Sequence, residues 1–179
     1  LYLHFMDVHN PYAPPAPYNR MFAGEKGRYQ YHNGLMKINS EDLNKSMGLY
    51  DGEIRFLDDK IRDLFSYLDK HELLKNTIVI INSDHGEEFM EHGGMGHGAT
   101  LYREQLHVPL FILPPGGIDM ERSIIPSPVR NIDILPTILD MLNIEPAADI
   151  DGVSLLDLIK GGDDLLTRPG LSRVVSHGL

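Results

Sequence analysis

One segment of the chain changes character abruptly, and this change constrains the fold more than any other feature. Thr77 to Asn82 is β-branched and apolar until its end, which is typical of a buried strand in a parallel sheet. Asp84 and His85 follow at once, and acidic, histidine and glycine residues continue to Gly98. Ligands of open α/β sheets bind beyond the carboxyl ends of the strands. The segment therefore predicts a sheet with a polar site at its edge.

Periodic apolar residues predict the elements around this strand. A long helix is predicted from Ser40, with Ser40 as N-cap, to about Lys70, because apolar residues recur there every three or four positions. Helix followed by strand is half of a βαβ crossover, and 179 residues suffice for one α/β domain or part of one. The other predicted elements are a short buried strand at 1–6, a strand near 108–113, a helix at about 132–142 and a short helix before 161.

Composition excludes several classes of function. The net charge of −10 argues against nucleic acid or an anionic membrane as the main partner. The absence of cysteine excludes disulfides, thiolate metal sites and a cysteine nucleophile from these residues. No apolar run approaches the roughly 20 residues of a membrane span. Because the chain opens in a strand-like run without an initiator Met, we expect a piece of a longer protein, and a periplasmic, extracellular or cytoplasmic location stays open.

Two predicted strand ends carry side chains that bind metals or transfer protons. Asp7 and His9 follow the first predicted strand, and Asp84 and His85 follow the second. A carboxylate beside an imidazole suits a divalent metal of intermediate hardness. A lone Asp-His pair at a strand end is more often a turn cap, but three histidines and four acids lie between Asp84 and His97. So many ionisable groups in one loop favour a functional site.

Longer motifs in the chain resemble those of a known family. These are "YDGEIRFLDDKIRDLFSYLDKHELLKNTIVIINSDHGE", then "EHG" and "GHG" before "LYREQLHVPLFI", together with "HFMDVHNPYAPP" and "NIDILPTILDMLNIEPAADIDGVSLLDLI". In this order they resemble the sulfatases, members of the alkaline phosphatase superfamily, over nearly the whole chain. The resemblance implies an α/β three-layer sandwich of the alkaline phosphatase/sulfatase type. Residues 1–179 would be one partial catalytic domain without its N-terminal portion.

The resemblance also implies roles for four residues. Asp84 and His85 are similar to the second pair of metal ligands. Many sulfatases have Asn where His85 stands, so the metal, first expected to be Ca²⁺, is open to Mn²⁺ or Zn²⁺. His9 is similar to the histidine that contacts the transferred sulfuryl or phosphoryl group. His97 stands where many sulfatases carry a Lys that contacts the ester oxygen, and both His9 and His97 are therefore expected to be catalytic.

Other polar residues near these motifs have two readings each. Glu87 and Glu88 either orient His85 or are solvated, and His92 is expected to shape its loop or the surroundings of the metal ligands. The loop from Pro11 to Gly34 is the expected specificity loop, and its tyrosines could stack on the rings of a saccharide substrate. These tyrosines are Tyr12, Tyr18, Tyr29 and Tyr31.

The chain lacks two parts that the family requires. Neither an Asp pair after a buried strand nor the "C/S-x-P-x-R" motif, whose Cys or Ser becomes the formylglycine nucleophile, is present. We therefore expect both outside these residues and expect the isolated chain to be inactive, with possible self-association through an exposed sheet edge. Three functions follow: a hydrolase of small-molecule or saccharide sulfate esters; a hydrolase of phosphoryl esters or phosphonates, or a phosphoglycerol transferase, of the same superfamily; and a non-catalytic metal- or anion-binding domain.

Overall fold

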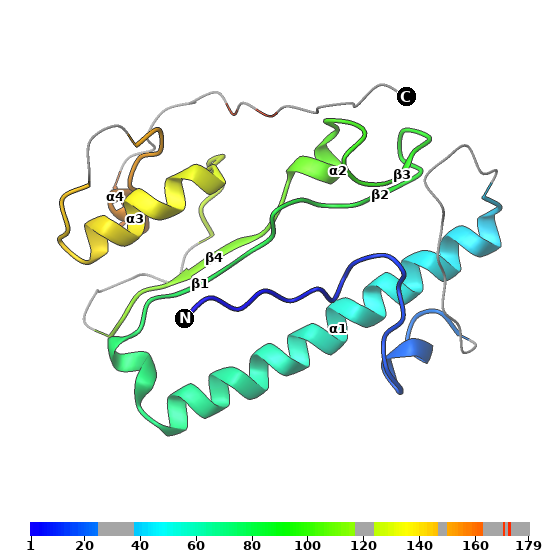
Figure 1. The fold of residues 1–179 in the computed structure, drawn as a ribbon, viewed down its shortest axis with the longest axis horizontal. Helices are drawn as coiled ribbons and strands as arrows, with labels where there is room; N and C mark the ends of the chain where they lie inside the picture. Colours follow the sequence, from blue (N-terminus) through cyan, green and yellow to red (C-terminus); the bar gives the residue numbers. More distant parts are fainter. Residues whose placement is uncertain (25–37, 117–123, 147–149, 163–169, 171, 173–179) are drawn as a thin grey trace. The chain divides into compact units, whose positions relative to one another are not determined.

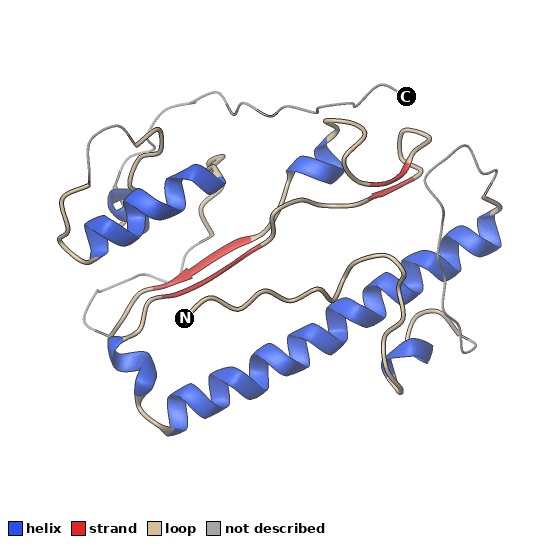
Figure 2. Ribbon diagram, in the orientation of Figure 1, coloured by secondary structure: helices blue, strands red, loops and turns tan. Residues whose placement is uncertain are grey.

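The chain divides into two compact units. The computed structural model describes residues 1–24, 38–116, 124–146, 150–162, 170 and 172. The first unit contains Leu1–His71 and Gly86–Gln105, and the second contains Glu72–His85 and Leu106–Leu179. Figures 1 and 2 show the elements of each unit. The interpretation of residues 1–179 as one partial domain stays a prediction.

The long helix predicted from the sequence dominates the first unit. Helix α1 runs over Ser40–Lys70, as predicted, and the short 3₁₀ helix η1 at Tyr18–Arg20 packs beside it (Figure 1). The N-cap is Asn39 rather than the predicted Ser40, since the Asn39 side chain accepts a 2.8 Å hydrogen bond from the Asp42 amide. An Asn at this position satisfies one of the amides that a helix start leaves without an intrahelical partner.

The apolar stripe predicted on α1 is only partly its buried face. Met47 and Ile54 belong to that stripe but are 41% and 44% exposed, whereas Gly48 and Gly52 are buried. A Cβ at Gly48 would lie 2.7 Å from the Phe22 carbonyl carbon, which is too close for any side chain. The chain before the helix therefore packs against the backbone of α1, and the glycines make this approach possible.

A small hairpin completes the first unit. Strand β2, Glu88–Phe89, pairs antiparallel with β3, Met95–Gly96. The short helix α2, Arg103–Leu106, follows the hairpin, and its first three residues belong to this unit. The buried centre is formed by Tyr12 and Leu49, with partly buried neighbours from the segment before α1, from α1 and from the hairpin. These neighbours are Ala23, Tyr50, Phe89 and Met95.

The second unit contains the strand that precedes Asp84. After the 3₁₀ helix η2, Leu73–Asn76, strand β1 at Val79–Asn82 pairs antiparallel with β4 at Leu110–Leu113. Both strands were predicted within two residues, but the parallel pairing and full burial expected for β1 are wrong. Asn82 pairs with Leu110, so the connecting chain leaves and returns at the same end of the pair, which antiparallel neighbours require. The apolar residues of β1 are half-buried.

Two helices cover one face of this strand pair. The 3₁₀ helix η3, Asn131–Asp133, continues into α3, Ile134–Met141, and a short α4 follows at Leu156–Ile159. These bounds confirm the predicted helix at 132–142. The buried residues of the cluster come from the two helices and the turn before α4, and Leu110 and Ile112 of β4 pack against it. The buried set is Met141, Leu155, Leu156 and Ile159.

The strand predicted at the N-terminus does not form. Residues 1–7 have no regular secondary structure, and Leu1, Tyr2 and Met6 are exposed. A strand requires a hydrogen-bonded neighbour, and the described residues supply none to this stretch. None of the helices within the described ranges is long and apolar enough to span a membrane.

Candidate active site

The loop that carries His9 is held by a buried carboxylate of α1. Glu53 is only 6% exposed and accepts hydrogen bonds from the amides of Val8, at 3.0 Å, and Ala13, at 2.6 Å. Burial raises the pKa of Glu53, and these amide bonds offset the rise only in part. Val8 has a φ of 71°, a left-handed conformation that is a genuine outlier for a β-branched residue. The His9 Nδ1 atom lies 2.7 Å from the Asn10 carbonyl oxygen and donates to it.

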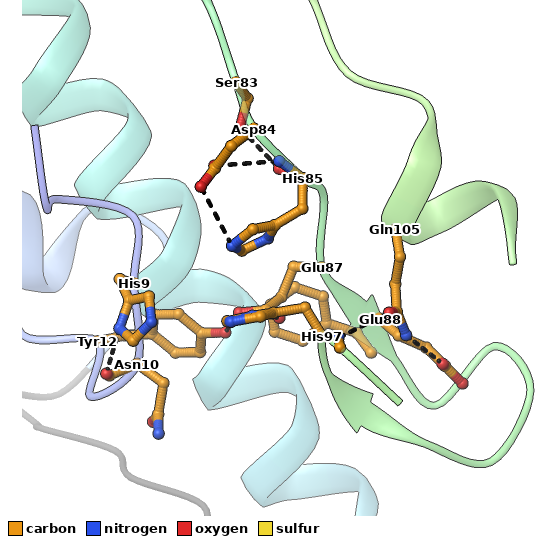
Figure 3. A network of polar contacts seen from close by, with 12 residues as sticks. His9, Asn10, Tyr12, Ser83, Asp84, His85, Glu87, Glu88, His97 and Gln105 are labelled. Atoms are coloured by element: carbon orange, nitrogen blue, oxygen red, sulfur yellow. Dashed lines mark hydrogen bonds and ion pairs between the residues drawn. The ribbon is translucent and has the colours of Figure 1, made fainter. Parts of the chain in front are cut away.

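His97 lies beside His9 in the first unit. Its Nδ1 atom is 2.8 Å from Oε1 of Glu87, whose side chain is 4% exposed. The other carboxylate oxygen of Glu87 accepts a 2.5 Å hydrogen bond from the hydroxyl of Tyr12. The ring centroids of His9 and His97 are 5.3 Å apart, with an interplanar angle of 62°. Figure 3 shows His9, Tyr12, Glu87 and His97 converging in this way.

Glu88 organises the hairpin next to His97. Its side chain is 1% exposed and accepts four hydrogen bonds from the loop and from α2. Burial raises the pKa of Glu88, but the four hydrogen bonds lower it by more than burial raises it. The pKa of Glu88 therefore lies below the ordinary value. The alternative that Glu87 and Glu88 are solvated is therefore wrong. The four donors are the amides of His92 and Gly94, the Thr100 hydroxyl and the Gln105 amide group.

Two further sequence predictions concern this unit. His92 stacks on Tyr102 with ring centroids 3.6 Å apart, and its Nδ1 atom lies 3.4 Å from Glu104, which agrees with a loop-shaping role. Tyr12 cannot stack on a sugar, because it is fully buried. Tyr18 donates its hydroxyl to Asp59 of α1 at 2.8 Å. Tyr29, Tyr31 and the end of the predicted specificity loop lie outside the described residues.

The predicted metal pair lies in the second unit, directly after β1. The His85 amide donates to Oδ1 of Asp84 at 3.0 Å, and Nε2 of His85 lies 3.8 Å from Oδ2 of Asp84 (Figure 3). The Ser83 hydroxyl donates to the His85 carbonyl oxygen at 2.6 Å. The side chains are 76% exposed for Asp84 and 38% exposed for His85.

The separation of these two atoms fits shared coordination of one ion. Protein oxygen and nitrogen ligands lie about 2.0 to 2.6 Å from divalent ions, so atoms 3.8 Å apart can both reach the same ion. The fit is incomplete, however. In the part of the chain that the structure describes, no group of three or more His, Asp or Glu side chains is placed to hold a metal. By themselves, Asp84 and His85 could supply only two of the ligands that a divalent ion needs.

The structure brings together the members of each predicted pair. His9 meets His97, and Asp84 meets His85, each within its own compact unit. Sequence reasoning missed Glu53 and the roles of Tyr12 and Glu87. One signal was available for Glu53, which lies beside Gly52 and five positions after Gly48. Two glycines inside one helix are costly unless a close contact requires them.

Comparison with known proteins identifies the family of this chain. The family model described as Sulfatase matches residues 1–144. Arylsulfatase K of Mus musculus is 33% identical over 124 residues, which are 69% of this chain and 22% of that protein. The chain spans about a quarter of the length of the curated relatives it matches.

Solved structures support the same conclusion. The phosphonate monoester hydrolase of Agrobacterium radiobacter has a TM-score of 0.72 and 26% identity, and the match covers 92% of this chain and 38% of that one. BT4656 in complex with its substrate D-glucosamine-2-N,6-O-disulfate has a TM-score of 0.55 and 31% identity, covering 66% and 24% of the two chains. These matches confirm the predicted fold class, a partial α/β fold of the alkaline phosphatase superfamily. On the family match over residues 1–144, the chain is a member of the sulfatase family.

Proposed function

We propose that the protein containing this chain is a metal-dependent hydrolase of sulfate esters. One observation carries the proposal: the rings of His9 and His97 lie 5.3 Å apart, each with its Nδ1 atom committed to a fixed acceptor. Two hydrogen bonds of about 2.9 Å, made to different oxygens of one anion, span more than this separation. A single sulfuryl group can therefore contact both imidazoles.

The committed Nδ1 atoms define what the two rings can do. When Nδ1 carries the proton of a neutral imidazole, Nε2 is the atom that accepts or releases a second proton. An imidazole protonated on both nitrogens can donate from Nε2 to an ester oxygen and recover the proton later. His9 is proposed to contact the transferred group, and His97 is proposed to donate toward the leaving oxygen.

Asp84 and His85 are proposed as two ligands of the divalent ion. The 3.8 Å separation of their donor atoms supports this assignment. When bound, such an ion neutralises charge on the non-bridging oxygens of the ester. A single carboxylate with one imidazole accepts Ca²⁺, Mn²⁺ or Zn²⁺, and Ca²⁺ is the first expectation. The formylglycine nucleophile and the remaining ligands are proposed to lie outside these 179 residues.

The substrate is proposed to be a small-molecule or saccharide sulfate ester. The support comes from relatives, since BT4656 has a disulfated glucosamine as substrate and other similar proteins are named arylsulfatases. A second candidate is a phosphonate or phosphoryl ester hydrolase. It is favoured by the match to a phosphonate monoester hydrolase over 92% of this chain and by histidine at both positions 85 and 97.

One set of assays separates these candidates. The purified full-length protein is incubated with an aryl sulfate, an aryl phosphate and an aryl phosphonate monoester, each with Ca²⁺ or Mn²⁺. We expect the sulfate to give the highest kcat/KM, and we expect His9→Ala and His97→Ala each to lower it by about 100-fold or more. His71→Ala, which changes an exposed histidine at the end of α1, serves as the matched control.

Two results would contradict the proposal. A preference for the phosphonate would favour the second candidate. Turnover of all esters unaffected by the loss of either His9 or His97 would remove both imidazoles from the reaction. The isolated 179-residue chain is expected to show no turnover, because it contains no activated nucleophile.

A further inference from the structure

Glu87 lies at the junction between the two histidine-bearing segments. One carboxylate oxygen contacts Nδ1 of His97 at 2.8 Å, and the other accepts the Tyr12 hydroxyl at 2.5 Å. Tyr12 belongs to the same loop as His9, three positions further along the chain. One carboxylate therefore connects His97, after the hairpin strand, to the loop of His9, which lies some 75 positions earlier in sequence than Glu87.

Tyr12 is a rigid attachment point for this loop. Its ring is fully buried and packs against Tyr50, with centroids 5.5 Å apart, and Phe89, with centroids 5.9 Å apart. The rings of Tyr50 and Phe89 contact each other at 5.0 Å. Aromatic contacts at these distances restrict a buried ring, which holds the Tyr12 hydroxyl against the Glu87 carboxylate.

The loop is held from a second side by its backbone. Glu53 of α1 accepts the amides of Val8 and Ala13, which flank His9 and Tyr12 in sequence. Glu53 therefore fixes the path of the loop, and within the described residues its hydrogen bonds come from this loop rather than from His97. Glu87 and Tyr12 form a hydrogen-bonded connection between the two histidine-bearing segments.

We infer that Glu87 and Tyr12 are positioning residues that hold His9 and His97 as a single unit. Glu87 fixes the Nδ1–H tautomer of His97 by accepting its proton in a hydrogen bond, which directs Nε2 toward the reacting group. Through the Tyr12 hydroxyl, the same carboxylate sets the distance between the two rings. The inference rests on the proposed function only in assigning the two histidines to ester hydrolysis.

The tautomer of His97 can be measured without any substrate. Long-range ¹H–¹⁵N NMR spectra of full-length protein labelled at histidine distinguish Nδ1–H from Nε2–H. We expect His97 to be the Nδ1–H tautomer in the parent protein and to lose that preference in Glu87→Ala. Glu87→Gln should restore it, because the amide oxygen of Gln still accepts from Nδ1. Glu53→Gln should leave the His97 spectrum unchanged while altering that of His9.

Kinetics test the coupling of the two rings. With the preferred ester, Glu87→Ala should lower kcat/KM by about 10- to 100-fold, the usual effect of removing a group that orients an essential histidine. Tyr12→Phe keeps the buried ring and removes only the hydroxyl, and we expect a smaller loss. In the Glu87→Ala background the Tyr12→Phe change should have no further effect, because the acceptor is already gone. Glu72→Gln and Tyr67→Phe, at exposed positions, are the matched controls.

Each outcome decides one question. Retention of the Nδ1–H tautomer in Glu87→Ala, or independent multiplying losses from Tyr12→Phe and Glu87→Ala, would overturn the inference. If Glu87→Ala fails to fold, the other two variants still test the inference: loss of the Nδ1–H tautomer in Glu87→Gln, or an unchanged kcat/KM in Tyr12→Phe, would overturn it. If the parent protein hydrolyses none of the esters while the tautomer changes as expected, the proposed function is wrong and the positioning by Glu87 stands.

Discussion

In the sequence, Gly86 lies between the proposed metal pair and Glu87, the carboxylate proposed to orient His97. Replacing Gly86 with Ala tests whether the close approach of this segment to the backbone of α2 is required. The Gly86 amide donates to the carbonyl oxygen of Gln105 at 2.8 Å. A Cβ added at Gly86 would lie 2.0 Å from the carbonyl oxygen of Glu104, at the start of α2. The obstacle is backbone rather than the end of a flexible side chain, so the neighbouring chain must move.

The size of the movement follows from that distance. Real Cβ atoms do not approach other heavy atoms within 3.0 Å, so a gap of 2.0 Å has to open by about 1 Å. Overpacking of this kind costs about 1–3 kcal/mol of unfolding free energy. A misplacement of about 1 Å in a catalytic group lowers turnover by roughly 100-fold. Gly86→Ala should therefore reduce both stability and activity.

Urea unfolding and steady-state kinetics measure the two effects on the full-length protein. Gly116→Ala is the matched control, because its added Cβ would meet the Lys75 carbonyl oxygen at 3.6 Å, an ordinary contact. We expect the control to change stability by less than about 0.5 kcal/mol. If Gly86→Ala unfolds at the same urea concentration as Gly116→Ala and keeps full turnover, the close approach of this segment to α2 is refuted.

Three further predictions concern other buried or exposed carboxylates. Asp133 is fully buried and accepts from Arg130 at 2.9 Å, so Asp133→Asn, which turns an amide donor toward other donors, should cost about 3–5 kcal/mol in urea unfolding. Burial raises the pKa of Glu88 but hydrogen bonds such as that from Gly94 lower it more, so its stabilising effect is present above the unfolded carboxyl pKa and is lost as pH falls through the lower folded value; acid titrations of Glu88→Gln should show a shallower loss of stability. Asp84→Ala should weaken Mn²⁺ binding measured by calorimetry and lower turnover by about 100-fold or more, and unchanged binding would remove it from the metal site.

The positions of the helices were predicted well from the sequence, but the buried face of α1 was predicted less well. The repeat of apolar residues located α1 within a residue of its observed start, because helix periodicity is a local property. The buried face of its first half was missed, because Gly48 and Gly52 admit the backbone near Phe22 and Tyr18. A contact of this kind depends on where a distant segment packs, and periodicity carries no information about it.

Strand predictions depended on partners in the same way. The apolar runs of β1 and β4 were predicted as strands, and these strands form because the two runs pair with each other. Leu1 to Met6 has an equally apolar pattern but forms no strand in the described part of the chain. Strand formation is non-local, so pattern alone predicts the capacity to pair and not the pairing. The predicted self-association through a sheet edge is untested and stays a prediction.

The candidate site shows the same limit most clearly in its three buried glutamates. Glu53 was not singled out from the sequence, and solvation was one of the two readings of Glu87 and Glu88, since ionised carboxylates are rarely buried. Each is buried here because donors from other segments face it, and most of those donors are backbone amides or hydroxyls whose positions no residue pattern reveals. The balance differs among them: burial outweighs three amide bonds and raises the pKa of Glu53, whereas four donors outweigh burial and lower the pKa of Glu88. The histidines could be proposed from motifs, but the carboxylates that orient them follow only from the folded backbone.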